Sequence, residues 1–235
     1  MLDVHRSDLV AAVAGSGTMG RGIVQVLAQC GVRTLVFDAK PGAAQAAKDS
    51  IAQALARLAE KGRLQQADVA ATLARIEVAG GLQALAPAHV VIEAIVEQLE
   101  PKRELFRALE DIVPESCILA SNTSSLSVTA MAAACRKPGR VAGYHYFNPV
   151  PVMKIVEVVA GELTEPWVTD ALIALAKRYG HTPVRCKDTP GFVVNHAGRG
   201  YIPEALRVMA LHRVAGPGAR LDAVLGLDVE LDAVL

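Results

Sequence analysis

The sequence predicts an α/β fold, with a doubly wound, largely parallel sheet followed by a short all-helical segment. Short apolar runs alternate along the chain with longer stretches whose apolar residues recur every three or four positions, as in strands that alternate with helices. The run at residues 88–94 (AHVVIEA) is almost continuously apolar, as expected of a parallel strand covered on both faces. After residue 191 the alternation stops and the pattern becomes helical.

The predicted elements follow one another with short connections. We expect strands at residues 10–14, 34–37, 76–79, 88–94, 118–120, 141–144, 155–159 and 182–186. We expect helices at residues 23–30, 41–61, 66–73, 100–112, 126–134, 164–179 and 192–211, with Thr164 as the N-cap of the sixth. The break at Pro190–Gly191 divides the chain into predicted domains 1–189 and 190–235. Near the end RLDAVL is echoed by ELDAVL, either as a pair of amphipathic helices or by accident of composition.

Composition and charge exclude several classes of protein. The 235 residues carry 24 basic and 24 acidic side chains, so nothing favours binding to nucleic acid or to an acidic membrane surface. No apolar run is long enough to span a membrane, and the first ten residues lack the basic start and apolar core of a signal peptide. Four widely spaced cysteines without a CxxC pair indicate reduced thiols in a cytoplasmic protein, and no metal site is predicted.

Residues 10–38 carry the pattern on which the functional prediction depends. A strand, a GxGxxG turn, a helix, a second strand and Asp38 follow one another in that order. A lone GxGxxG is often just a flexible loop. Here the flanking strands, the helix and the acidic residue together indicate a dinucleotide-binding site. Gly15 permits the tight turn, Gly17 lets the backbone approach a pyrophosphate, and Gly20 lets the helix pack closely on the strand. Asp38 can accept hydrogen bonds from the adenosine ribose and would repel a 2′-phosphate, so the predicted cofactor is NAD.

Polar residues at later strand ends are candidates for chemistry. His145 ends a strand, where open α/β sheets bind their ligands, and Glu157 lies on the next strand. A histidine there can take a hydroxyl proton while the glutamate fixes its tautomer, although the pair could also merely link two elements. Ser124 and Ser125 could contact a ligand or cap the next helix, and Asn195 has the same ambiguity.

Several charged residues also have two readings. Glu97 and Lys102 form either an ordinary surface ion pair or a group that reaches over the cofactor. Lys48 and Lys61 are most simply solvated, but one of them could meet a ligand phosphate.

Five segments together resemble the L-3-hydroxyacyl-CoA dehydrogenase family. They are GSGTMGRGI, VIEAIVEQLEPKRELF, ILASNTSSLSVTAM, GYHYFNPVPVMKIVEVV and CKDTPGFVVNH, and the resemblance runs from about residue 9 to residue 209. It implies a Rossmann-like domain that binds NAD and a C-terminal helical domain that closes the active site and dimerises.

The resemblance assigns roles to residues that match the family's motifs. It implies that His145 is the catalytic base, Glu157 its partner, Ser124 the residue that contacts substrate and nicotinamide, and Asn195 a second catalytic residue that contacts substrate. A lysine that contacts CoA falls on Lys61. The implied NAD contacts are Gly15, Gly17, Thr18, Met19, Gly20, Asp38, Glu97, Lys102, Ser124 and Asn148.

The chain also departs from the family pattern. Only 44 residues follow Gly191, fewer than the family's helical domain contains, so we expect an incomplete helical domain. Apolar residues of the last helix, Leu206, Met209 and Leu211, would then favour a homodimer or a larger homo-oligomer. We expect normal NAD binding by this chain and weak or absent turnover of acyl-CoA.

The expected function is the interconversion of (S)-3-hydroxyacyl-CoA and 3-ketoacyl-CoA with NAD, as in fatty acid β-oxidation. One alternative is a dehydrogenase of the L-gulonate type, which uses the same scaffold on a hydroxy acid without CoA. The other is an NAD-binding protein that is catalytically impaired or structural.

Overall fold

The computed structural model describes residues 2–212, and for residues 209–212 the backbone alone. The chain divides into two compact units, residues 1–192 and residues 193–235. The described part of the second unit is the helix α7 (Val194–His212) with the residue before it. The repeated LDAVL segments lie outside the described residues.

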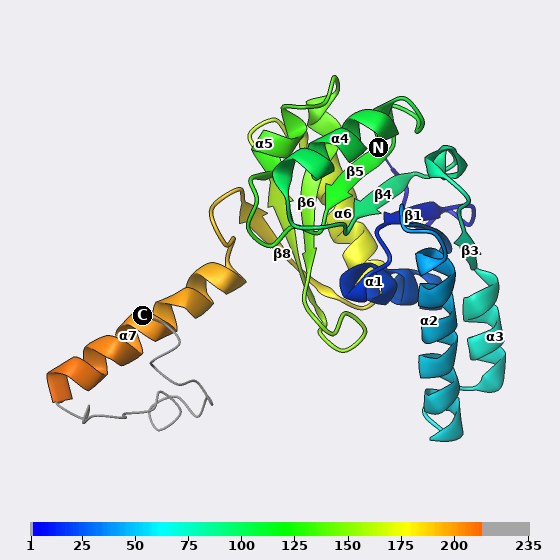
Figure 1. Cartoon of the computed structure of the whole chain (residues 1–235), viewed down its shortest axis with the longest axis horizontal. Helices are drawn as coiled ribbons and strands as arrows, with labels where there is room; N and C mark the ends of the chain where they lie inside the picture. Colours follow the sequence, from blue (N-terminus) through cyan, green and yellow to red (C-terminus); the bar gives the residue numbers. More distant parts are fainter. Residues whose placement is uncertain (1, 213–235) are drawn as a thin grey trace. The chain divides into compact units, whose positions relative to one another are not determined.

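The first unit is built on one eight-stranded sheet (Figure 1). Its strand order is β3-β2-β1-β4-β5-β6-β7-β8, and all neighbours pair in parallel except β6 and β7. The strands are β1 (Val10–Ala14), β2 (Arg33–Phe37), β3 (Ile76–Val78), β4 (Val90–Glu93), β5 (Ile118–Ser121), β6 (Val141–Tyr146), β7 (Ile155–Ala160) and β8 (Thr182–Lys187). The predicted doubly wound, largely parallel sheet is confirmed.

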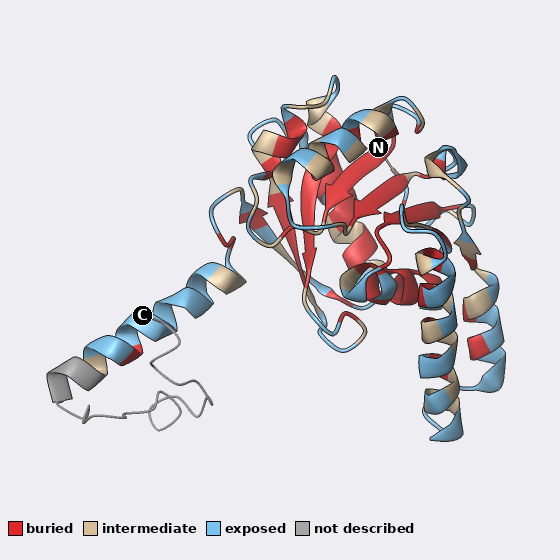
Figure 2. Ribbon diagram, in the orientation of Figure 1, coloured by how far each residue is buried: buried red, intermediate tan, exposed pale blue. Residues whose placement is uncertain are grey.

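Helices cover both faces of this sheet because its strands are apolar on both faces. Successive residues of β1 alternate between two buried clusters, with Ala11 and Val13 in one and Val10, Ala12 and Ala14 in the other. The first cluster also contains residues of α1, α2 and α6, and the second contains residues of α4 and α5. Figure 2 shows the strands as the most buried part of this unit. The helices are α1 (Thr18–Gln29), α2 (Ala43–Glu60), α3 (Gln66–Ala74), α4 (Leu99–Glu110), α5 (Val128–Ala132) and α6 (Pro166–Arg178), with short 3-10 turns at Leu82–Leu85 and Pro138–Arg140.

Two expectations about helix starts are wrong. The helix α1 begins at Thr18 rather than at residue 23, because the glycine loop itself forms its first turn. Thr164 does not cap α6, which begins at Pro166 after Glu165. The Thr164 hydroxyl instead donates to the carbonyl of Val141 at 2.6 Å, and so ties the start of β6 to the loop after β7.

The described residues contain no helix that is long and apolar enough to cross a membrane. Among the same residues no group of three metal-ligating side chains is found. All four cysteines are free thiols, two of them buried and two half-buried.

Candidate functional site

The glycine loop between β1 and α1 has the geometry that its sequence predicts. Gly15 has φ +101°, which side chains rarely adopt, and a Cβ there would lie 2.4 Å from the carbonyl oxygen of Ala94. A Cβ on Gly20 would lie 1.8 Å from the carbonyl oxygen of Gly15, so only glycine lets the helix approach the turn. A Cβ on Gly17 would have no described atom within 4 Å, so space remains open beside this part of the loop.

The N-terminus of α1 suits an anion. Gly17 is its N-cap, no side chain of the described residues caps it, and no acidic residue lies in its first turn. The first amide groups of a helix have no partner within the helix, and the helix dipole makes this end positive. The loop therefore fits the pyrophosphate of a dinucleotide.

Asp38 lies beside this loop at the carboxyl end of β2. One carboxylate oxygen accepts hydrogen bonds from the amide and the hydroxyl of Ser16, at 2.8 and 2.6 Å. The other accepts from the amide of Lys40 at 2.9 Å. Burial alone would raise the pKa of Asp38, but these bonds outweigh it and hold the pKa below its ordinary value. The sequence analysis did not predict the contact of Ser16 with Asp38, although the position of Ser16 between two loop glycines places it at the cofactor site.

A cleft of about 350 Å³ opens at the carboxyl ends of β4, β5 and β6. It brings together six of the predicted residues, namely Met19, Glu97, Lys102, Ser124, His145 and Asn148. It is also lined by five residues that the sequence did not single out, namely Ala94, Ile95, Asn122, Tyr146 and Phe147. Ligands of open α/β sheets bind at this edge, next to the point where the strand order reverses around β1.

His145 and Glu157 form a buried pair in the wall of this cleft. They are directly opposite in the antiparallel register of β6 and β7, and His145 Nδ1 lies 2.7 Å from Glu157 Oε2. Glu157 is fully buried, and its Oε1 accepts from the thiol of Cys186 at 3.7 Å. A neutral imidazole that donates Nδ1–H to the carboxylate carries its lone pair on Nε2. The pair can therefore work as a base with a built-in counter-ion.

Glu97 organises the turn that carries Ser124. One of its oxygens accepts from the Thr123 hydroxyl at 2.6 Å and from the Ser124 amide at 2.8 Å, while the Ser124 hydroxyl lies 3.3 Å away. Burial alone would raise the pKa of Glu97, but the hydrogen bonds from this turn and the ammonium of Lys102 lower it overall. The helix-cap reading of Ser124 and Ser125 is wrong, because Ser127 caps α5 and accepts from the amide of Ala130 at 3.1 Å.

Lys102 is a buried cation. Its side chain is 1% exposed, and Nζ lies 2.6 Å from Glu93 and 3.1 Å from Glu97. The reading of Glu97 and Lys102 as a surface ion pair is therefore wrong. Asn122, another residue that sequence reasoning missed, joins β5 to β6 by accepting from the amide of Tyr146 at 2.9 Å. The position of Asn122 in the polar turn after a strand could have predicted this role.

Two of the three predicted substrate contacts are not among the residues that line this cleft. Lys61 is exposed at the C-cap of α2, and Asn195 lies in the first turn of α7 in the second unit. Their roles stay predictions. The solvated reading is wrong for Lys48, whose ammonium donates to the carbonyl of Ile76 at 2.6 Å.

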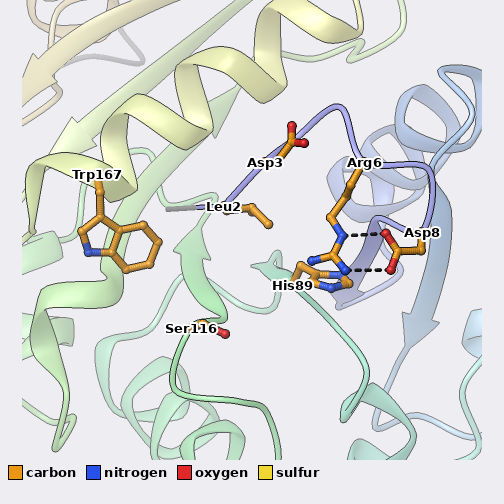
Figure 3. Close-up of a pocket in the computed structure, with 7 residues that line it drawn as sticks. All are labelled: Leu2, Asp3, Arg6, Asp8, His89, Ser116 and Trp167. Atoms are coloured by element: carbon orange, nitrogen blue, oxygen red, sulfur yellow. Dashed lines mark hydrogen bonds and ion pairs between the residues drawn. The ribbon is translucent and has the colours of Figure 1, made fainter.

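A second hollow of about 350 Å³ adjoins the cleft through the shared residue Asn148. It lies between α1, α2 and the loop 148–151, and Arg21 and Arg57 are its cationic residues. A larger cavity of about 530 Å³ lies at the amino ends of β1, β4 and β5 (Figure 3). None of the residues with predicted chemistry lines it; its charged lining includes the ion pair of Arg6 and Asp8.

Comparison with known proteins now identifies the family. The family model described as 3-hydroxyacyl-CoA dehydrogenase, NAD binding domain, matches residues 10–189. The chain belongs to this family. The family match and the fit of the glycine loop both make NAD its cofactor.

Relatives and solved structures of 3-hydroxyacyl-CoA dehydrogenases agree with this assignment. The 3-hydroxyadipyl-CoA dehydrogenase of Escherichia coli is 44% identical over 214 residues, which cover 91% of this chain and 45% of that protein. A probable 3-hydroxybutyryl-CoA dehydrogenase of Bacillus subtilis is 42% identical, covering 92% of this chain and 74% of that protein. The crystal structure of (S)-3-hydroxybutyryl-CoA dehydrogenase from Ralstonia eutropha superposes with a TM-score of 0.83 at 38% identity, covering 88% and 73%. The chain thus spans less than half of the first relative and about three quarters of the other two proteins.

Proposed function

We propose that the protein interconverts (S)-3-hydroxyacyl-CoA and 3-ketoacyl-CoA by hydride transfer with NAD. The observation that carries this proposal is the buried pair of His145 and Glu157, which shares one cleft with Met19 of the nucleotide loop. A base must lie within reach of the alcohol whose hydride passes to the cofactor. This cleft holds the base and lies at the sheet edge where the cofactor binds.

The oxidation of the alcohol divides between a proton and a hydride. NAD supplies the acceptor for the hydride that leaves C3 of the substrate. His145 takes the proton of the C3 hydroxyl on Nε2, so that the C3–O single bond becomes the carbonyl of the product. The carboxylate of Glu157, 2.7 Å from Nδ1, stabilises the imidazolium that results and fixes the tautomer beforehand. In the reverse direction the same nitrogen returns the proton.

Neighbouring residues would hold the reactants. Ser124 lines the cleft and its amide is fixed by Glu97. Its hydroxyl donates to Glu97 at 3.3 Å and would turn to donate to the reacting oxygen when substrate binds. We assign Asn195 of α7 to the same oxygen, on the family resemblance. The remaining cofactor contacts proposed are Gly15, Gly17, Thr18, Met19, Gly20, Asp38, Glu97, Lys102, Ser124 and Asn148.

The adjoining hollow supports a CoA ester as substrate rather than a free hydroxy acid. A free acid would fill only the cleft, whereas CoA also carries phosphates that need cations. Arg57 lines this hollow on α2, and Lys61 follows four positions later at the end of the same helix. Residues four apart lie on one helix face, so both cations can meet the same phosphate-bearing ligand.

We further propose a cytoplasmic homodimer or larger homo-oligomer. The free cysteines support a reducing compartment. The exposed apolar side chains of Tyr201, Ile202 and Leu206 on α7 support association.

The function is tested by following NADH oxidation with a chain-length series of 3-ketoacyl-CoA esters and with the matching free 3-keto acids. We expect oxidation that depends on the CoA ester, with a KM that rises in Arg57→Gln while the NADH Kd stays unchanged. Equal turnover of the free acids would favour a dehydrogenase of the L-gulonate type. Tight NADH binding without any turnover would favour a non-catalytic protein.

A further inference from the structure

A fully buried carboxylate, Glu93, lies behind the cleft and does not line it. It is the last residue of β4, and all its hydrogen-bond partners are internal. Its Oε1 accepts from the ammonium of Lys102 at 2.6 Å and from the amide of Ile95 at 2.7 Å. Its Oε2 accepts from the hydroxyl of Ser121 at 2.6 Å. Burying a carboxylate costs desolvation free energy, which a paired cation and hydrogen bonds must offset.

The charge of Glu93 is not fully balanced, because its cation is shared. Lys102 also lies 3.1 Å from Glu97, whose side chain is 39% exposed and lines the cleft. Two carboxylates and one ammonium give the cluster of Glu93, Lys102 and Glu97 a net charge of −1. The other titratable side chains at the cleft are His145 and Tyr146, which line it, and the buried Glu157 behind His145. The carboxylate of Glu157 adds a charge of the same sign as the net charge of the cluster.

The cleft is the nicotinamide end of the dinucleotide site. Asp38 on β2 marks the adenosine side of the loop, and the pyrophosphate fits the N-terminus of α1. The rest of the dinucleotide must therefore extend across β1 towards β4 and β5, where the cleft lies. The nicotinamide ring is cationic in NAD⁺ and neutral in NADH, so a negative cluster beside it interacts differently with the two forms.

We propose that Glu93 is a positioning residue whose buried charge, held by Lys102 and Ser121, makes the cleft favour the oxidised, cationic nicotinamide over the reduced ring. Glu93 does so without touching the cofactor, through the net charge of the cluster. The proposal rests on the proposed function only for the cofactor site and is independent of acyl-CoA.

The test is the ratio of the Kd of NAD⁺ to the Kd of NADH at pH 8. NADH is titrated by its fluorescence and NAD⁺ by its displacement of NADH. Glu93→Gln keeps the size of the side chain and its hydrogen bond to Ser121 but changes the cluster charge from −1 to 0. At separations of about 10 Å in a partly solvated site we expect the ratio to rise about three- to tenfold. A merely structural role would weaken both forms equally and leave the ratio unchanged.

A double variant restores the charge of the cluster without restoring Glu93. In Glu93→Gln/Lys102→Gln the cluster charge is −1, as in the parent chain, and Glu97 alone carries it. We expect the ratio to return to the parent value, even though both forms of the cofactor bind more weakly than to the parent chain. The double variant replaces a buried ion pair by two amides that can hydrogen-bond, so it can be measured even if Glu93→Gln alone does not fold.

The matched control is Glu110→Gln. Glu110 is also a buried carboxylate beside a buried cation, at 3.4 Å from Arg140, but it lies outside the cleft lining. It should lower stability and leave the ratio at the parent value. An unchanged ratio in folded Glu93→Gln, a raised ratio in the double variant, or an equal change in Glu110→Gln overturns the proposal. Because no acyl-CoA is present, absence of turnover would defeat the proposed function and leave this result standing.

Discussion

The chemistry of the candidate site depends on the register of one residue pair. His145 and Glu157 meet because they are directly opposite in β6 and β7. A slip of one residue would turn the carboxylate to the other face of the sheet, where α6 packs on apolar side chains. The pair is almost completely excluded from water, so its interaction is stronger than it would be at the surface.

The first prediction removes the base. His145→Gln should lower kcat by roughly 10² to 10⁴-fold, because the C3 hydroxyl proton loses its acceptor. The Kd of NADH should stay within about twofold of its original value, because the pyrophosphate contacts are untouched. Steady-state kinetics with a 3-ketoacyl-CoA and NADH fluorescence titration measure the two effects. Unchanged turnover would mean that another residue is the base.

Glu157→Gln tests whether Glu157 acts by orienting the His145 ring or by its negative charge. The amide can still hydrogen-bond to Nδ1 but cannot balance an imidazolium, so we expect the fold to persist and much of the rate to be lost. Circular dichroism checks the fold and steady-state kinetics the rate. A full rate would assign the pair a purely structural role.

At the residue scale, sequence motifs predicted what lines the cleft but not how it is supported. Six of the residues that the family motifs imply line one cleft, whereas Lys61 lies outside it and Asn195 belongs to the other unit. The burial of Lys102 could not be predicted, because its charged surroundings in α4 are typical of a solvated helix face. Its burial follows from a long-range contact with Glu93 that no local pattern encodes.

At the element scale, α5 is held in place by a residue from the far end of the sheet. Asp188, just after β8, accepts from the amides of Val128 and Thr129 at 2.9 and 2.8 Å and from the hydroxyl of Ser127 at 2.8 Å. It thus acts as a second N-cap for a helix of only five residues. Burial alone would raise the pKa of Asp188, but these hydrogen bonds outweigh it and lower the pKa overall.

Asp188→Ala should reduce the free energy of unfolding by about 1–2 kcal/mol at pH 7. Since the folded pKa lies below the unfolded value of about 3.9, the contribution of Asp188 is complete above that value and is lost as the pH falls through the folded pKa. The difference between variant and parent should therefore shrink below about pH 4. Urea unfolding at several pH values measures it. A difference that persists unchanged at low pH would mean that the carboxylate charge is not its source.

Strands and helices were predicted better than their ends. Every predicted strand is present, because short, near-continuous apolar runs that alternate with helices are typical of buried parallel strands. The start of α1 was misjudged because glycines hide a helical turn from an apolar periodicity. Thr164 was misjudged because its hydroxyl bonds to a strand that is distant in sequence.

At the scale of the whole molecule, the first unit contains the sheet, both buried clusters and the cleft. We expect residues 1–192 expressed alone to fold and to bind NADH as the full chain does. We expect the full chain to sediment as a dimer or larger and the fragment as a monomer, because the exposed apolar residues lie on α7. Sedimentation equilibrium and NADH titration on both chains test this. A monomeric full chain would contradict the association.

The two outer strands of the sheet limit how copies can join. The strand β3 has only three residues, too few to template another strand well. At the opposite edge, β8 carries Pro183, which cannot donate a backbone hydrogen bond, and the exposed cation Lys187, which would repel the same edge of a second copy. Both borders of the sheet are thus protected against strand addition and aggregation. Among the described residues, the helices and loops are therefore the surfaces on which we expect copies of this chain to associate, with no strand shared between two sheets.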